Sequence, residues 1–163
     1  MKKVLILAAA AILWSGAAFA ATTPPVWVGG LLVTGLVGAD CGNSQFTNYT
    51  VNEMYTAVFH PKLSGDSSVT TDVLQISQGG QKAYHYIPSG SVHFAAGAGN
   101  YSATTWTGRA TIKTFTGTFS NLAITPATIH ANTKFVEITG TFNKVDALNC
   151  SVTFAMPLTL KAP

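Results

Sequence analysis

The chain has 163 residues, of which nine are Lys or Arg and six are Asp or Glu, and only 9% are charged. Ordinary soluble domains contain about 25% charged residues. Two of the nine basic residues, Lys2 and Lys3, lie at the N-terminus, so the rest of the chain carries seven basic and six acidic residues. Because these charges nearly balance and no Lys or Arg cluster forms a phosphate-binding stripe, the composition argues against nucleic-acid binding.

Residues 1–20 predict a cleavable signal peptide. Lys2 and Lys3 precede a short apolar run over 4–14, and Ala18-Phe19-Ala20 places small residues where signal peptidase cleaves. The apolar run is too short for a comfortable membrane span. We therefore expect export to the periplasm, the cell surface or the medium of a bacterium, without membrane insertion.

Residues 21–25 predict a flexible leader, and residues 26–163 predict a single all-β domain. Short runs rich in Val, Ile, Thr, Phe and Tyr alternate there with Gly, Asn, Asp and Pro, and no stretch has helical periodicity. We predict eight strands, over 26–37, 49–60, 71–77, 82–87, 101–113, 114–124, 133–143 and 150–160. The segment 90–100 is compatible with a short extra strand.

Two of these strands show the alternation of an antiparallel sheet with one buried face and one wet face. In the last strand the apolar set is Cys150, Val152, Phe154, Met156, Leu158 and Leu160. In the strand before it, Val136, Ile138, Gly140 and Phe142 alternate with Glu137, Thr139 and Thr141.

The segment 72–87 predicts a β-hairpin around Gly79-Gly80, because glycine tolerates positive φ at both positions of a two-residue primed turn. Such a turn sets Ser77 opposite Lys82 and Leu74 opposite His85. Directly paired residues share a face. We therefore expect an apolar side with Leu74, Ile76, Ala83 and His85, and a more polar side with Val73, Gln75, Tyr84 and Tyr86.

Cys41 and Cys150 are the two cysteines of the chain, and an even count in an exported protein favours a disulfide. Cys41 follows the first predicted strand and Cys150 begins the last. A bond between them therefore favours first and last strands that are antiparallel neighbours. A small closed barrel and some sandwiches both meet this condition. We therefore expect an antiparallel β-sandwich or a small barrel of about eight strands, and the uneven lengths of the predicted strands slightly favour the sandwich.

The tetrapeptide Thr-Gly-Thr-Phe occurs twice, at 116–119 and 139–142. Related Thr-Gly pairs lie at 34–35 and 107–108, and their irregular spacing argues against a solenoid. Glycine within a strand marks a bulge, a bend or a close backbone approach. We interpret the repeat as bends in curved strands rather than as a recognition motif.

The sequence contains no clear signature of a catalytic or metal site. His60, His85, His93 and His130 form no HxH or HExxH pair, a GxSxG nucleophile motif does not occur, and the six carboxylates are scattered. We therefore predict no catalytic residue, no metal and no cofactor, and an enzyme is disfavoured.

Aromatic side chains are the better candidates for binding. Tyr84 and Tyr86 share a predicted strand face, and Tyr101 and Trp106 lie in a nearby segment. Exposed rings can stack on a sugar or another flat apolar surface, although tyrosines also pack across strands in any sheet. His85 could serve as a polar anchor for a ligand or as a hydrogen-bonded core residue. These five residues form the predicted ligand-binding set.

A surface with few charges has little self-repulsion, so contact with its own copies or with a neutral partner costs less. We expect an exported, non-catalytic β domain with a structural, adhesive or assembly role, through self-association or a surface partner. Two alternatives stay open: a periplasmic β-barrel that binds a small apolar ligand, and an eight-stranded outer-membrane barrel. The cysteine pair argues against the second alternative.

Overall fold

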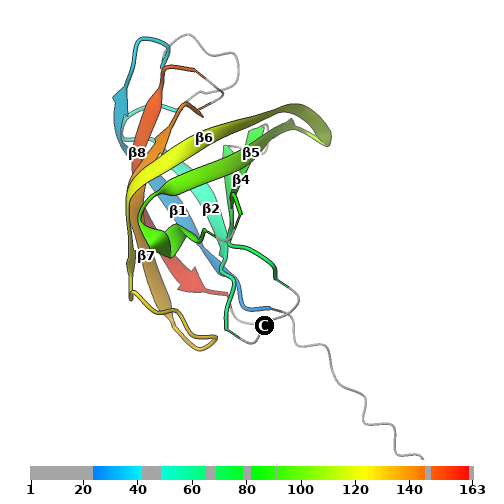
Figure 1. The fold of residues 1–163 in the computed structure, drawn as a ribbon, viewed down its shortest axis with the longest axis vertical. Helices are drawn as coiled ribbons and strands as arrows, with labels where there is room; N and C mark the ends of the chain where they lie inside the picture. The colour runs from blue at the N-terminus through cyan, green and yellow to red at the C-terminus, as the bar shows by residue number, and fades with distance from the viewer. Residues whose placement is uncertain are drawn as a thin grey trace, which may run out of the picture.

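A computed structural model describes residues 24–41, 49–64, 69–78, 82–90, 92–145 and 148–161. Within these ranges the chain forms eight strands and one short 3₁₀ helix (Figure 1). The strands are β1 (Trp27–Val37), β2 (Met54–His60), β3 (Val73–Gln78), β4 (Lys82–Pro88), β5 (Gly99–Thr107), β6 (Ala110–Thr125), β7 (Phe135–Asn143) and β8 (Ser151–Leu160), and the helix is η1 (Phe94–Ala96). The predicted signal peptide lies outside the described residues, as does most of the predicted leader. No helix in the described ranges is long and apolar enough to cross a membrane.

The eight strands close into one antiparallel barrel, in which each strand pairs with the next along the chain and β8 pairs with β1. The prediction of an all-β, antiparallel, eight-strand fold is confirmed, but the preference for a sandwich is wrong. The uneven lengths have another cause: β6 has 16 residues and β7 has nine, so β6 extends past β7. The surplus length leaves the barrel wall as part of the β5–β6 hairpin, at the upper right of Figure 1.

Most strand boundaries lie within a few residues of their predicted positions, but the division between β5 and β6 is displaced. The predicted strands 101–113 and 114–124 meet inside β6, whereas the observed turn is at Gly108-Arg109. The Thr-Gly pair at 107–108, interpreted above as a bend, belongs to this turn. The segment 90–100 contains η1 and the first two residues of β5 instead of an extra strand.

Cys41 and Cys150 form a disulfide, with their Cα atoms 4.8 Å apart, which confirms the predicted bond. The first and last strands are antiparallel neighbours as expected, and Val37 at the end of β1 pairs with Ser151 at the start of β8. The disulfide thus fixes the β1–β8 seam at one end of the barrel, called here the disulfide end. At the opposite end, called the terminal end, β1 begins and β8 ends (Figure 1).

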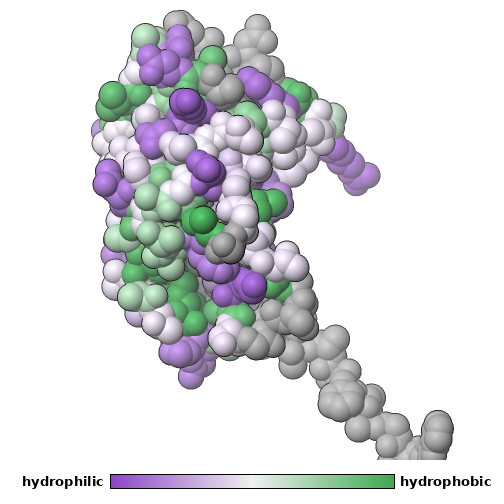
Figure 2. Space-filling model, in the orientation of Figure 1, coloured by the Kyte–Doolittle hydropathy of each residue, from purple (hydrophilic) through white to green (hydrophobic). Residues whose placement is uncertain are grey.

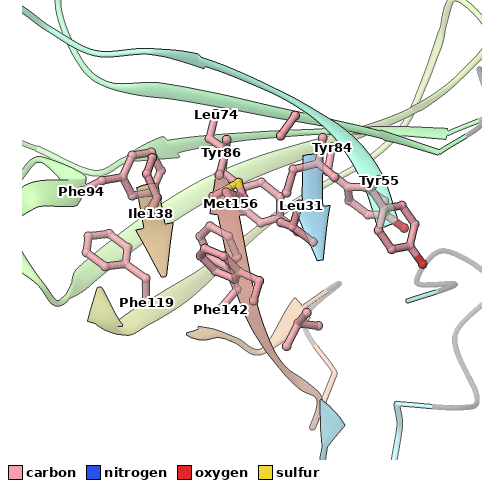
Figure 3. Close-up of a cluster of buried hydrophobic side chains, with 14 of the residues drawn as sticks. Leu31, Tyr55, Leu74, Tyr84, Tyr86, Phe94, Phe119, Ile138, Phe142 and Met156 are labelled. Atoms are coloured by element: carbon pink, nitrogen blue, oxygen red, sulfur yellow. The ribbon is translucent and has the colours of Figure 1, made fainter. Parts of the chain in front are cut away.

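Apolar and aromatic side chains fill the barrel interior (Figure 3). The alternation predicted for β7 and β8 is confirmed, since their apolar sets point inward and Glu137 is exposed. Phe142 lies at the centre of the aromatic cluster, with its ring stacked on Tyr86 at 4.3 Å and on Phe154 at 4.8 Å between centroids. The space enclosed by the strands is therefore occupied by a packed core.

The two copies of Thr-Gly-Thr-Phe place glycine where a neighbouring side chain needs room. A Cβ atom on Gly117 would meet the Tyr101 hydroxyl and the Asn143 carbonyl, and that hydroxyl donates a 2.7 Å hydrogen bond to that carbonyl. A Cβ atom on Gly140 would meet the side chain of Leu122. At these two positions the repeat meets a packing requirement, which is the close approach that strand glycines allow.

Candidate functional site

The β3–β4 hairpin has a register one residue away from the predicted one. Gln78 pairs with Lys82, and Gln75 pairs with His85. The described residues end at Gln78 and resume at Lys82, so the predicted Gly79-Gly80 turn lies outside them. A slip of one residue exchanges the faces of a strand.

Burial of the two tyrosine rings accounts for this register. The inward residues are Leu74, Ile76, Tyr84 and Tyr86, each at most 1% exposed. The predicted register would instead bury Ala83 and His85, which present less apolar area and a titratable ring. His85 lies on the outer face, so its predicted place on the apolar side is wrong, as is the polar side predicted for the tyrosines.

The five predicted binding residues do not form one surface. Tyr84, Tyr86 and Tyr101 belong to the core, where the rings of Tyr86 and Tyr101 meet edge to face at 5.1 Å. His85 and Trp106 remain together on the outer face, with ring centroids 5.5 Å apart. The predicted aromatic platform is thus reduced to one histidine–tryptophan pair.

The surroundings of His60 and His85, which both lie on the outer face of the wall, favour the neutral imidazole. Burial by the surrounding wall lowers the pKa of His85, and the charge of His60 lowers it further. Burial also lowers the pKa of His60. His85 does not point into the barrel. The predicted small-ligand barrel used an inward His85 as its polar anchor, and the structure does not provide that anchor.

Tyrosine hydroxyls form hydrogen bonds toward the disulfide end. The hydroxyls of Tyr49 and Tyr86 lie 3.3 Å apart. The Tyr55 hydroxyl donates to the Glu53 carboxylate at 2.8 Å and accepts the N–H of Thr50 at 3.2 Å. Burial, reinforced by the Glu53 carboxylate, raises the pKa of Tyr55 well above its ordinary value, and burial does the same for Tyr86. These hydroxyls therefore stay protonated and link the loops to the core.

A pocket of about 400 Å³ opens at the terminal end of the barrel. The end of β2 and the loop after it, η1, and the β6–β7 loop form its walls. Phe59, Leu63, Ile124 and Ile129 supply much of the apolar lining, and Lys62, His93 and His130 supply basic groups. The pocket therefore combines an apolar wall with nitrogen-bearing side chains.

Asp72 holds the loops of this pocket together. It is buried, and its Oδ1 accepts the Lys62 N–H at 2.8 Å while its Oδ2 accepts the Phe94 N–H at 2.9 Å. The Nδ1 atom of His93 lies 3.5 Å from Oδ1. Hydrogen bonds to a carboxylate are among the stronger ones in proteins. Because both oxygens already accept backbone donors, Asp72 is a structural residue of the pocket.

Along part of its length β6 pairs with β5 only, so its second edge has no partner strand among the described residues. Residues 110–117 pair with β5, and among the described residues the pairing with β7 begins only at Thr118 opposite Asn143. The chain leaves the sheet at Lys144, where φ is +55°. In an antiparallel strand about half of the backbone N–H and C=O groups face each side. The projecting part of the hairpin, visible in Figure 1, therefore has a backbone edge that no described strand pairs with.

Comparisons with protein-family models, curated protein sequences and solved structures gave no significant match to this chain. Across the ranges that the structure describes, no three His, Cys, Asp or Glu side chains gather closely enough to hold a metal ion. Among the described residues, the β6 edge and the terminal-end pocket are two features with a geometry suited to binding.

Sequence reasoning missed both of these features. The pocket depends on three loops that are distant in the sequence, and no local pattern relates them. The edge had a usable signal, because a turn placed at Gly108-Arg109 makes the following strand much longer than the next one. A long strand beside a short one cannot be covered along its full length.

Proposed function

We propose that the protein is an exported, non-catalytic assembly module whose copies join by strand addition at the β6 edge. The observation that carries this proposal is that, within the described ranges, residues 110–117 pair on one side only in an otherwise closed barrel. Closure of a barrel removes sheet edges, and an edge that remains is a template for another strand. Strand addition at such an edge is a recurrent mode of protein recognition.

The sequence of the edge suits pairing with a second copy. Residues 110–117 read ATIKTFTG, which is rich in β-forming residues and contains a single charge, on Lys113. A two-fold antiparallel pairing centred on Thr114 sets Ile112 opposite Thr116 of the second copy and Lys113 opposite its Phe115. No like charges face each other in this register. The same patch serves both copies, as in the common two-fold dimer.

The outer wall beside the edge is neutral and rich in hydroxyl groups. The hydroxyls of Thr104 and Thr114 lie 3.5 Å apart, and those of Thr141 and Thr153 lie 3.3 Å apart. Pale, weakly polar residues cover much of the visible face in Figure 2. Such a wall adds little repulsion when two copies approach.

The same arrangement favours the assembly proposal over the outer-membrane alternative. Outer-membrane barrels carry an apolar band outside and polar groups inside. Here most of the aromatic side chains point inward, with Trp106 and Phe135 outside, while the outward positions of β6 include Thr114, Thr116 and Thr118, all exposed.

We infer export from the signal-like segment at 1–20 together with the disulfide, because disulfides persist in oxidising compartments. Protein recovered from the periplasm of a bacterial host should begin at Ala21 and contain no free thiol. Intact mass spectrometry with and without alkylation measures both properties. Recovery of the uncleaved chain with two free thiols would contradict export.

Assembly through β6 should be sensitive to charge at Thr114 and Thr116. Replacing both with lysine places like charges opposite each other at the centre of the proposed pairing, where juxtaposed like charges cost several kcal/mol. We expect the wild type to show a dimer that grows with protein concentration, and the T114K/T116K variant to dimerise more than about tenfold less tightly. Size-exclusion chromatography with light scattering over a concentration series measures this.

The matched control is T56K/T159K, which also adds two lysines at exposed positions, but on strands with a neighbour on each side. This variant should dimerise like the wild type, and thermal unfolding of both variants checks that the fold is retained. A wild type that stays monomeric at every concentration would refute the proposal, as would equal loss of the dimer in the control.

A further inference from the structure

The terminal-end pocket is suited in size and position to a ligand of its own. Its volume of about 400 Å³ lies within the range of small-molecule sites, about 300–1,000 Å³. It is formed by the loops that follow β2 and β6 and by η1, whereas the β6 edge belongs to the projecting hairpin. The pocket is therefore independent of the proposed assembly function.

The apolar wall of the pocket retains surface that a ligand can cover. Phe59 is fully buried and joins the wall to the core. Leu63, Ile124 and Ile129 pack against that core but are only partly buried. Covering their remaining apolar surface is favourable, since burial of apolar area drives association. This part of the pocket fits the hydrocarbon body of a ligand.

The polar groups of the pocket favour a negative charge on that ligand. Lys62, His93 and His130 line the pocket, and Asp72 is the acidic residue among the lining side chains. Both Asp72 oxygens already accept backbone N–H groups, so its carboxylate is compensated. A ligand anion would thus meet a lysine ammonium and the N–H donors of two imidazoles, and a ligand cation would be repelled by that ammonium.

His93 is oriented for this role by the contact with Asp72. Its Nδ1 atom is buried, has no hydrogen-bond partner among the described residues, and lies 3.5 Å from Asp72 Oδ1. The side chain as a whole is 42% exposed. Since Nδ1 is covered, the opposite edge of the ring, with Nε2, is the part that a ligand can reach.

We propose that this pocket binds a small amphiphile with an apolar body and one anionic group, of the medium-chain carboxylate type. The hydrocarbon covers Leu63, Ile124 and Ile129, and the carboxylate lies among Lys62, His93 and His130. Because binding uses neither β6 residues 110–117 nor the disulfide end, it persists in a variant that no longer dimerises.

Octanoate is the probe that tests this proposal, with octan-1-ol and octylammonium as ligands of matched length and different charge. Titrations followed by ¹H–¹⁵N NMR should show octanoate perturbing the amides of 59–64, 93–95 and 124–131. We expect octanoate to bind at least about threefold more tightly than octan-1-ol, and octylammonium to bind most weakly. A partly exposed charge pair contributes enough free energy for a difference in affinity of this size.

The K62Q/H130Q variant removes two of the three basic groups from the pocket. Octanoate affinity should fall roughly three- to tenfold, while octan-1-ol affinity stays unchanged. The control is K134Q, an exposed lysine outside the pocket lining, which should bind octanoate like the wild type. Shifts outside the pocket loops, equal binding of octanoate and octan-1-ol, or an unchanged octanoate affinity in K62Q/H130Q would each overturn the proposal.

Discussion

Replacing both Cys41 and Cys150 with alanine should lower the free energy of unfolding by about 4–5 kcal/mol. The bond joins residues 109 positions apart, and the entropy that it removes from the unfolded chain grows with the logarithm of loop length. Domains of this size have about 5–15 kcal/mol of stability in total. The midpoint of thermal unfolding should therefore fall by roughly 10–20 °C. Urea unfolding followed by the fluorescence of buried Trp27 provides the free energies.

Chemical reduction supplies the control for the cysteine variant. A reductant should destabilise the wild type by a similar amount and leave the double variant unaffected. The hydrogen bond from the Asn149 N–H to Asp40 Oδ2, 3.0 Å long, remains in both and keeps the seam in register. A double variant within about 1 kcal/mol of the oxidised wild type would show that the bridge does not restrain the unfolded chain as argued.

Replacing Phe142 with alanine should cost about 3–5 kcal/mol, the usual loss for a buried phenylalanine. The residue is 2% exposed, and its ring is stacked between those of Tyr86 and Phe154. The resulting cavity would lie at the centre of the core, where the closed wall limits collapse. Urea unfolding measures the loss, and Phe142→Leu, with an expected cost below about 1.5 kcal/mol, keeps the test informative if the alanine variant does not fold.

Phe135 on the same strand is the matched control. Its side chain points outward and is 47% exposed, so Phe135→Ala should change stability by no more than about 0.5 kcal/mol. Equal losses at positions 135 and 142 would contradict the assignment of the inward face of β7.

Local sequence patterns predict the strands and the seam of this fold, but they do not predict barrel closure. The alternation in β7 and β8 identifies the inward residues, and the placement of Cys41 and Cys150 identifies the first and last strands as neighbours. A sandwich and a barrel share these local patterns, however. Closure depends on the tilt and stagger of all eight strands together, which no single segment encodes.

The β3–β4 register shows how one ambiguous residue type can mislead. Tyrosine has a polar tip and a large apolar body, so Tyr84 and Tyr86 are compatible with either face of the strand. The Gly79-Gly80 pair favoured one register, and the gain from burying both rings favours the other. Because every side chain changes face with a one-residue slip, this single error displaced His85 and both tyrosines from their true sides.

The candidate sites could be predicted only in part because each depends on segments that the fold, and not the local sequence, brings together. The pocket brings together 59–64, 93–95 and 124–131, which are distant in the sequence and joined by the buried Asp72. The β6 edge follows from the difference in length between β6 and β7, which requires the turn at Gly108-Arg109 to be placed correctly. The sequence features that favour assembly are the low charge, the abundant threonine and the lack of catalytic motifs, and none of them indicates where on the barrel the copies would join.

Amide hydrogen exchange of residues 110–117, measured over a range of protein concentrations, tests most directly whether the β6 edge joins copies of the chain. In dilute protein, the amides that face away from β5 should exchange rapidly. At concentrations where the dimer forms, their exchange should slow in proportion to the dimer fraction, while amides of β1 and β8 stay unchanged. Exchange at 110–117 that is independent of concentration, or new protection elsewhere on the wall, would contradict assembly through this edge.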